Sequence, residues 1–347
     1  MTASYRIALV GASSLRGKEL NEALAESSFA ASDFLLMDDQ KALGQLEPAG
    51  EEVTFIQRIT ADSFERVDFT FFAGDPEDTN KYWQDALRAG ASIVDLTYAL
   101  EAEPGVLVRA PWFAEETGEG DARTPDLHTP AIVPAHPAAL TLALLMERIQ
   151  NSGAVRNVSA TFLESASEYG RAALDELHQQ TVSLLSFQSV PRDFYDIQVA
   201  FNAIAATGEG AKINLAEREA LIRRHYALLS GGRLPELALQ LIHVPVFHGH
   251  NFSIAVEFED RVAFEHVEAA LAGAHVEVIL SDVEAPSNLT SAGQEDILAR
   301  LRSDEPGASH SRRFWLWVST DNLKLSAANA VECAQELRKL RPTGKVQ

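Results

Sequence analysis

The sequence predicts an α/β protein in which a Rossmann-type, doubly wound parallel sheet domain is followed by an α+β domain. Three observations lead to this fold class. A chain of 347 residues is too long for one compact core and indicates two domains. Strand-like and helix-like runs alternate over the first part of the chain, which is typical of a doubly wound sheet. A glycine turn follows the first strand-like run, as it does in nucleotide-binding βαβ units.

The amino-terminal part supplies the βαβ pattern. Residues 6–12 form a short apolar run that closes on a glycine, which predicts a buried parallel strand. Residues 18–26 show helical spacing of Leu20 and Leu24, and a second helix is predicted at 82–89. Further strands of this sheet are predicted at 34–37, 53–56, 67–73 and 91–96.

The βαβ rhythm is lost after about residue 130, which indicates the α+β domain. Residues 239–246 and 252–258 alternate like an antiparallel pair joined by a turn at 248–251. We place the first domain in residues 1–132 plus 323–347 and the second in residues 133–322. The other predicted elements are helices at 138–149, 171–185, 215–229 and 327–340, and strands at 156–163 and 314–319.

The composition argues against several classes of protein. Fifty acidic residues against 29 basic ones give a net charge of −21, which disfavours contact with a nucleic-acid backbone. No apolar run reaches the ~18 residues of a membrane span, and the first residues lack the pattern of a signal peptide. The single cysteine cannot form an internal disulfide, which fits a reducing cytoplasm. We expect a cytoplasmic protein without nucleic-acid or membrane partners.

The turn after the first strand has the residues of a dinucleotide-binding loop. Gly11 and Gly17 enclose Ser13, Ser14 and Leu15 between a strand and a helix. In that context backbone N–H groups can hold a pyrophosphate at the start of the helix. A serine replaces the middle glycine, and the same strand–turn–helix also occurs as ordinary packing.

Asp38 closes the second predicted strand and bears on the choice of cofactor. A carboxylate at this place accepts hydrogen bonds from a ribose 2′-hydroxyl and repels a 2′-phosphate. If a cofactor binds, NAD is therefore favoured over NADP. The alternative interpretation is a solvent-exposed acidic turn.

Four segments resemble the aspartate-semialdehyde dehydrogenase family, which also includes N-acetyl-glutamyl-phosphate reductase. They are VGASSLRG at 10–17, AGASIVDLT at 89–97, HVPVFHGH at 243–250 and WVSTDNL at 317–323. The resemblance covers essentially the whole chain. It implies that the second domain is a dimerisation domain, so we expect a homodimer. It also implies a nicotinamide dinucleotide, and it adds Gly74 and Asn322 to the expected cofactor-binding residues.

The resemblance breaks at the nucleophile. In the family a cysteine thiolate attacks the aldehyde, a histidine moves the proton, and hydride passes to the nicotinamide. The motif places that cysteine at Ala139, or at Ala138 if the register is shifted by one residue. The only cysteine of the chain is Cys333. His250 keeps the position of the family's histidine.

Three positions that the resemblance assigns to anion binding carry other side chains. His243 stands where the family has an arginine that binds the substrate carboxylate. Glu101 stands where a second arginine is expected, and Glu219 stands where a lysine is expected. Loss of bidentate arginine contacts and gain of carboxylates should abolish recognition of a small anionic substrate.

Three hypotheses follow. The first is a dinucleotide-binding or regulatory homodimer that resembles the family's cysteine-less bacterial paralogues and lacks phosphorylating dehydrogenase activity. The second is an NAD-dependent oxidoreductase that acts on an aldehyde or oxo group of another substrate without a thioacyl step, with His250 as acid and base. The third is an interaction protein that associates through the sheet of the second domain. We interpret His136, His243, His248 and His250 as ordinary polar residues and expect no metal site.

Overall fold

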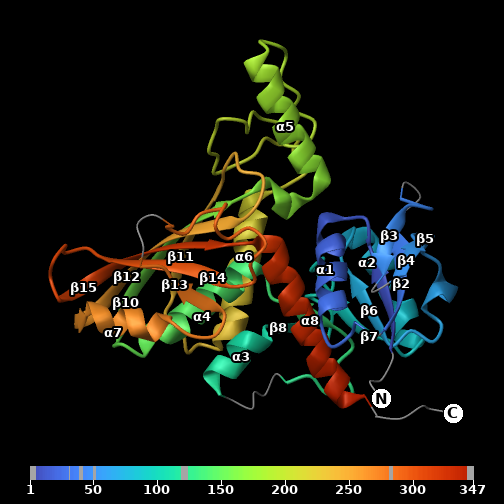
Figure 1. Ribbon diagram of the computed structural model, residues 1–347, viewed down its shortest axis with the longest axis horizontal. Coiled ribbons are helices and arrows are strands. Elements are labelled where there is room, and N and C mark those ends of the chain that lie inside the picture. Colours follow the sequence, from blue (N-terminus) through green and yellow to red (C-terminus); the bar gives the residue numbers. More distant parts are fainter. Residues whose placement is uncertain are drawn as a thin grey trace. The chain divides into compact units, whose positions relative to one another are not determined.

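The computed structural model describes residues 5–30, 32–38, 42–49, 52–118, 124–280 and 284–341. These residues form two compact units. Unit 1 comprises the described residues of Met1–Ala135 and Ser326–Gln347, and unit 2 comprises those of His136–Leu325. The helices and strands of both are labelled in Figure 1. None of the helices in this described part of the chain is long and apolar enough to span a membrane.

Unit 1 is built on a seven-stranded sheet in the order β5-β2-β1-β6-β7-β9-β8, and neighbouring strands are parallel throughout. The chain leaves β1 toward β2 on one side and toward β6 on the other. This reversal confirms the predicted doubly wound class. The strands are β1 (Arg6–Val10), β2 (Asp33–Asp38), β5 (Gln57–Arg58), β6 (Phe69–Phe72), β7 (Ser92–Asp95), β8 (Leu107–Arg109) and β9 (Ile132–Pro134).

Helices cover both faces of this sheet because the side chains of β1 alternate between two apolar layers. Ile7 and Leu9 pack in a cluster with residues of α1 and α8, whereas Ala8 and Val10 pack in a second cluster with residues of η1 and α2. The helical elements are α1 (Leu15–Glu26), η1 (Ala61–Phe64), α2 (Pro76–Arg88), α3 (Pro111–Thr117) and, from Ser326 on, α8 (Asn322–Leu340).

The strand predicted at 53–56 does not belong to the main sheet, and this prediction was wrong. β4 (Glu52–Phe55) pairs antiparallel with β3 (Leu46–Ala49) in a separate two-stranded sheet. Val53 and Phe55 are 65% and 58% exposed, whereas strands of a doubly wound sheet are buried on both faces. The short apolar run thus indicated a strand correctly but did not indicate which sheet it joins.

Unit 2 contains a mixed six-stranded sheet in the order β11-β10-β12-β15-β14-β13, as expected of the α+β class. Its longest strands, β12 and β15, alternate buried and more exposed residues, so one face of the sheet lies against the core. The strands are β10 (Val155–Glu164), β11 (Leu237–His243), β12 (His250–Ala263), β13 (Val276–Val278), β14 (Ile297–Ser303) and β15 (His310–Thr320).

The helix α4 occupies the interior of unit 2. It is buried almost throughout its length and packs against α6, α7 and β10, as expected of a helix that is apolar on all sides. In Figure 1, α5 projects from the rest of unit 2. The helical elements are α4 (Pro137–Gln150), η2 (Ala166–Tyr169), α5 (Arg171–Leu185), α6 (Leu215–Ser230) and α7 (Phe264–Leu271).

The predicted antiparallel pairing of 239–246 with 252–258 was wrong. β10 lies between β11 and β12, pairing parallel with β11 and antiparallel with β12. Alternation of apolar residues predicted each strand, but it carries no information about a strand from earlier in the chain that enters between the two. The segment that joins β11 to β12 is therefore a crossing over the end of β10.

Candidate functional site

Glycines hold the turn between β1 and α1 in a conformation that a side chain would prevent. Gly11 has a φ of +83°, in the left-handed region that favours glycine. A Cβ on Gly11 would lie 2.2 Å from Cα of Gly74, and one on Gly17 would lie 2.1 Å from the carbonyl oxygen of Gly11. The glycine turn, the first turn of α1 and the residues that follow β6 therefore approach backbone to backbone at Gly11, Gly17 and Gly74, all of them expected cofactor-binding residues.

Ser14 caps α1 and joins it to β6. Its Oγ accepts a hydrogen bond from the N–H of Gly17 and donates one to the carbonyl of Ala73, both at 2.8 Å. Because of this cap, α1 begins at Leu15, three residues before the predicted start. The first turn of the helix presents the positive end of its dipole beside the glycine turn, which suits an anionic group.

Asp38 lies at the end of β2 and faces the same turn. Its carboxylate accepts a hydrogen bond from the backbone N–H of Ser13 at 2.7 Å. The contact requires the end of β2 and the glycine turn to be adjacent, and the parallel pairing of β1 with β2 makes them so. The expected cofactor residues of unit 1 therefore form one contiguous group.

The first turn of α4, where the resemblance places the nucleophile, has no reactive atom. It begins with Pro137, Ala138 and Ala139, all buried. The one cysteine of the chain, Cys333, is buried in α8 within the core of unit 1. Burial raises the pKa of its thiol well above the usual value. Cys333 therefore stays protonated, which makes it a poor nucleophile.

His136 precedes α4 and acts as its N-cap. Its Nδ1 accepts the N–H of Ala138 at 3.1 Å, and its own backbone N–H donates to Nδ1 of His225 at 2.9 Å. Because Nδ1 accepts, the neutral ring carries its proton on Nε2, which donates to Glu168 at 3.2 Å. Burial lowers the pKa of His136 to about 3, against the opposing effect of the Glu168 carboxylate. The ring is therefore uncharged at neutral pH.

A single carboxylate gathers three nitrogen-bearing side chains in unit 2. Oε1 of Glu168 lies 3.2 Å from Nε2 of His136 and 3.5 Å from Nη1 of Arg218, and Oε2 lies 3.3 Å from Nε2 of His250. The rings of His136 and His250 are parallel, with centroids 6.0 Å apart. We refer to these four residues as the Glu168 cluster. His250, at the expected position of the family's histidine, is fully buried within it.

Backbone hydrogen bonds fix the position of Glu168. It lies in η2, directly after β10, and the N–H groups of Ala166 and Ser167 donate to the carbonyls of Val246 and Phe247, both at 2.9 Å. The segment that crosses from β11 to β12 therefore holds η2 by its main chain. This brings Glu168 and His250 to the same end of the sheet.

Asn322, an expected cofactor-binding residue, is buried and makes its contacts inside unit 2. Its Oδ1 accepts hydrogen bonds from Oγ of Ser167 at 3.0 Å and from the N–H of Gly249 at 3.1 Å. Asn322 thereby links η2 to the turn that precedes His250.

His243, at the expected position of a substrate arginine, faces a carboxylate of the chain itself. His243 and Glu164 end two adjacent parallel strands and are partners in register. Nδ1 of His243 lies 3.7 Å from Oε2 of Glu164, and both side chains are fully buried. The ring of Tyr195 packs 5.1 Å from that of His243. Burial and the Glu164 carboxylate raise the pKa of Tyr195, so this residue stays neutral.

The two acidic residues at the other expected anion-binding positions lie in different units. Glu219 accepts hydrogen bonds from Nη2 of Arg223 at 2.9 Å and from the N–H of Leu241 at 2.8 Å, and so ties α6 to β11. Glu101 lies in unit 1, in the turn after β7, where its N–H donates to the carbonyl of Tyr98 at 3.4 Å. Both are carboxylates and cannot bind an anionic group as an arginine would.

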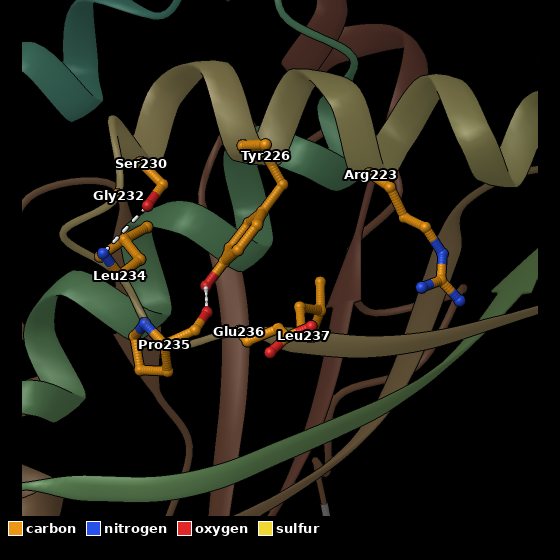
Figure 2. Close-up of a pocket in the computed structure, with 9 residues that line it drawn as sticks. Arg223, Tyr226, Ser230, Gly232, Leu234, Pro235, Glu236 and Leu237 are labelled. Atoms are coloured by element: carbon orange, nitrogen blue, oxygen red, sulfur yellow. Dashed lines mark hydrogen bonds between the residues drawn. The ribbon is translucent and has the colours of Figure 1, made fainter.

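Two cavities of unit 2 are lined by other residues. One of about 230 Å³ lies between α6 and the start of β11 (Figure 2). There Tyr226 donates to the carbonyl of Pro235 at 2.8 Å and Oγ of Ser230 accepts from Leu234 at 2.9 Å, so these polar groups bind the protein itself. A second cavity, of about 330 Å³, lies beside Phe258. Among the described residues, no set of three or more His, Cys, Asp or Glu side chains is arranged to hold a metal ion.

Sequence reasoning did not identify Glu168 or Arg218 as members of a site. His136 and Glu168 are 32 residues apart, and Arg218 and His250 come from still later elements. No short motif connects the four. The one usable signal was a run of small polar residues and acids directly after a strand, at 164–168. To place Glu168 in a site from this signal, one would have needed to know which strands are adjacent.

Two family models match the chain. The model described as the semialdehyde dehydrogenase NAD-binding domain matches residues 6–134, and the model described as the semialdehyde dehydrogenase dimerisation domain matches residues 146–325. The boundary between the two matches falls close to the division between unit 1 and unit 2.

Similar proteins are found along the whole chain. It is 27% identical to an aspartate-semialdehyde dehydrogenase of Rickettsia bellii, over 98% of this chain and 99% of that one. It is also 27% identical to a USG-1 protein homolog of Azotobacter vinelandii, over 98% and 99% of the two chains. The structure of a probable aspartate-semialdehyde dehydrogenase from Pseudomonas aeruginosa superposes with a TM-score of 0.81 at 25% identity, covering 97% of this chain and 99% of that chain.

Proposed function

We propose that this chain, which belongs to the semialdehyde dehydrogenase family, is a dinucleotide-binding homodimer of regulatory function without the family's covalent dehydrogenase activity. The observation that carries this proposal is the first turn of α4. A thioacyl step needs a thiolate or a comparably activated nucleophile next to the substrate. Pro137, Ala138 and Ala139 offer none, and the only thiol of the chain is buried and protonated in unit 1.

The side chains at two expected anion-binding positions of unit 2 support the same conclusion. His243 faces Glu164, and Glu219 is bound to Arg223 and to a backbone N–H. A small anionic substrate would meet carboxylates at these places. The repulsion and the loss of bidentate contacts both act against binding.

The residues of unit 1 fit a dinucleotide. A Cβ at Gly11 or Gly17 would fill the space where main chains approach, and the capped start of α1 offers the positive end of a helix dipole. The Gly11–Gly17 turn would hold the pyrophosphate, and Asp38 would hold ribose hydroxyls, so NAD is preferred to NADP. When bound, a nicotinamide dinucleotide accepts or delivers hydride. The matching family model is described as an NAD-binding domain.

Titration of the purified protein with NAD, NADH, NADP and NADPH by calorimetry tests the binding part of the proposal. We expect NAD or NADH to bind, and we expect NADP and NADPH, which carry a 2′-phosphate, to bind more weakly. Absence of binding by all four would refute it. Light scattering tests the homodimer, and a monodisperse monomer would contradict it.

An assay with aspartate semialdehyde, phosphate and either dinucleotide tests the loss of activity, and we expect no turnover. Robust turnover would overturn the proposal. The competing function, non-covalent hydride transfer with His250 as acid and base, is favoured by the 3.3 Å approach of His250 to Glu168. It predicts slow, His250-dependent reduction of other aldehydes or ketones by NADH. A His250→Gln variant separates the two functions. If the protein is a reductase, the variant should lose the slow reduction; if the protein is regulatory, neither the variant nor the unchanged protein should show any.

A further inference from the structure

We propose that the side chain of Glu168 is a built-in occupant of a carboxylate-binding site in unit 2, and that a free acetate ion occupies this site when the side chain is removed. The proposal concerns unit 2 alone and does not depend on whether unit 1 binds a dinucleotide. It identifies Arg218, His136 and His250 as the residues that bind the carboxylate.

Three residues converge on the carboxylate of Glu168. The three residues come from separate elements: the N-cap of α4, the second turn of α6 and the first position of β12. Their nitrogens nevertheless lie 3.2, 3.5 and 3.3 Å from the oxygens of one carboxylate. Donors spaced around both oxygens of a carboxylate form the arrangement by which proteins bind free carboxylates.

The Glu168 cluster is largely buried. The side chains of His136 and His250 are fully buried, that of Glu168 is 2% exposed and that of Arg218 is 18% exposed. An ionised carboxylate is strongly disfavoured in such a place unless its partners compensate for the lost water. The contacts of the Glu168 carboxylate with these three residues therefore take the place of contacts with water.

Glu168 fits imperfectly among these residues. Within the part of the chain that the structure describes, neither ring nitrogen of His250 has a hydrogen-bond partner, although Nε2 lies 3.3 Å from Oε2 of Glu168. The carboxylate of Glu168 is attached to η2, whose main chain is bonded to the β11–β12 crossing, and in its observed position it makes no hydrogen bond to His250. A free carboxylate has no such tether and can align with His250 as well.

The size of the space selects the ligand. Replacement of glutamate by alanine removes Cγ and the carboxylate group, which together have the heavy atoms of an acetate ion. Acetate therefore fills the vacated volume without moving its walls, whereas phosphate is bulkier and carries more charge. Formate is smaller and leaves part of the space empty, so it should bind more weakly than acetate.

The test compares Glu168→Ala with the unchanged protein in sodium acetate, at ionic strength held constant with sodium chloride. Two measurements are made: the thermal midpoint, and the NMR signals of the histidine rings. We expect acetate to raise the midpoint of Glu168→Ala in a saturable manner, as one-site binding to the folded state requires. It should also shift the signals of His136 and His250. The unchanged protein should show neither effect over the same acetate range, because its affinity for acetate should be at least roughly tenfold weaker than that of Glu168→Ala.

Two control variants address the mechanism. Glu168→Gln keeps the volume of the side chain but removes its charge, so it should not bind acetate because the space stays filled. Glu168→Ala combined with Arg218→Gln removes the cation and should lose most of the acetate affinity of the single variant.

The outcomes are decisive in each case. Absence of acetate binding by Glu168→Ala, or equal binding by the unchanged protein, would overturn the proposal. Equal binding by the variant that also lacks Arg218 would do the same. If Glu168→Ala does not fold in chloride, its refolding yield is compared in acetate and chloride. Acetate-dependent folding supports the site, and equal failure in both salts overturns it.

Discussion

The carboxylate of Asp38 accepts the backbone N–H of Ser13 at 2.7 Å, and this contact joins the end of β2 to the glycine turn. The acidic residue that we propose to bear on the choice of dinucleotide is thereby oriented by a main-chain contact. Its position is set by the pairing of β1 with β2 and not by a flexible loop. A preoriented group loses less conformational freedom on binding.

The first prediction concerns this residue. Replacement of Asp38 by serine should weaken NAD binding and narrow its advantage over NADP, because the acceptor for ribose hydroxyls and the charge that repels a 2′-phosphate are both lost. Asp38→Asn is the matched control, since it keeps an acceptor for Ser13 and loses only the charge. Calorimetric titration of both variants measures the ratio of the two affinities. An unchanged ratio in Asp38→Ser would exclude Asp38 from the cofactor site.

Steric crowding at the glycine turn gives the second prediction. Gly11→Ala places a methyl group 2.2 Å from Cα of Gly74, whereas Gly90→Ala has nothing within 4 Å, and the two positions have similar φ angles of +83° and +90°. Gly90→Ala should cost about 1 kcal/mol from its backbone conformation alone. Gly11→Ala should cost at least about 2 kcal/mol more, because main-chain atoms must move. Equal thermal midpoints in calorimetry would contradict the close approach of the two main chains.

The third prediction concerns pH. The pKa of His136 in the folded protein is about 3, below its ordinary value of 6.5. Between these values the unfolded chain binds the extra proton, so stability falls as pH drops below about 6.5, by about 1 kcal/mol per pH unit from this residue. His136→Asn keeps an N-cap acceptor and does not titrate. Urea unfolding at about pH 7.5 and about pH 5.5 should give a smaller pH dependence for the variant, and an equal dependence would refute the assignment.

A buried ion pair in unit 1 yields the fourth prediction. Arg109 donates from Nε and Nη2 to the two oxygens of Glu336 at 2.8 and 2.7 Å, and the side chains are only 8% and 17% exposed. Arg109→Met or Glu336→Leu alone should cost about 3 kcal/mol, because each leaves a buried charge without its partner. The double variant should cost clearly less than the sum. Additive losses in a double-mutant cycle would show that the two residues are not coupled.

The fifth prediction addresses the thiol. Cys333 is fully buried and its thiol pKa is well above the usual value. A thiol reagent should therefore react with the native protein far more slowly than with the unfolded chain, which should release one equivalent. Cys333→Ala should abolish the reaction in both states. Rapid labelling of the native protein would show that α8 opens readily or that the thiol is exposed.

The sequence predicted the doubly wound sheet because its signals are local. A buried strand and a glycine turn occupy fewer than a dozen consecutive residues each, and both appear in the structure at β1 and Gly11. The helix at 171–185 was predicted with its observed bounds for the same reason. Its apolar spacing is continuous, and a glycine precedes it.

The pairing of strands was harder to predict from the sequence. The predicted pairing of β11 with β12 was wrong because β10 enters between them. The strand β4 was assigned to the main sheet because its apolar residues suggested burial, whereas Val53 and Phe55 are exposed. The Glu168 cluster escaped prediction for a related reason. Its members meet only after β10, β11 and β12 are placed side by side, and no local spacing records that order. The positions taken from the family resemblance remain predictions.

The main-chain bonds from Ala166 and Ser167 to the β11–β12 crossing also bear on how such a protein can diverge. Amide-to-carbonyl bonds do not depend on side-chain identity, so the main chain beside residue 168 should keep its position when that side chain is replaced. A substitution at residue 168 would then exchange one functional group for another within the same main-chain framework. In this chain a single substitution at residue 168 is therefore enough to change the chemistry of a buried place in unit 2.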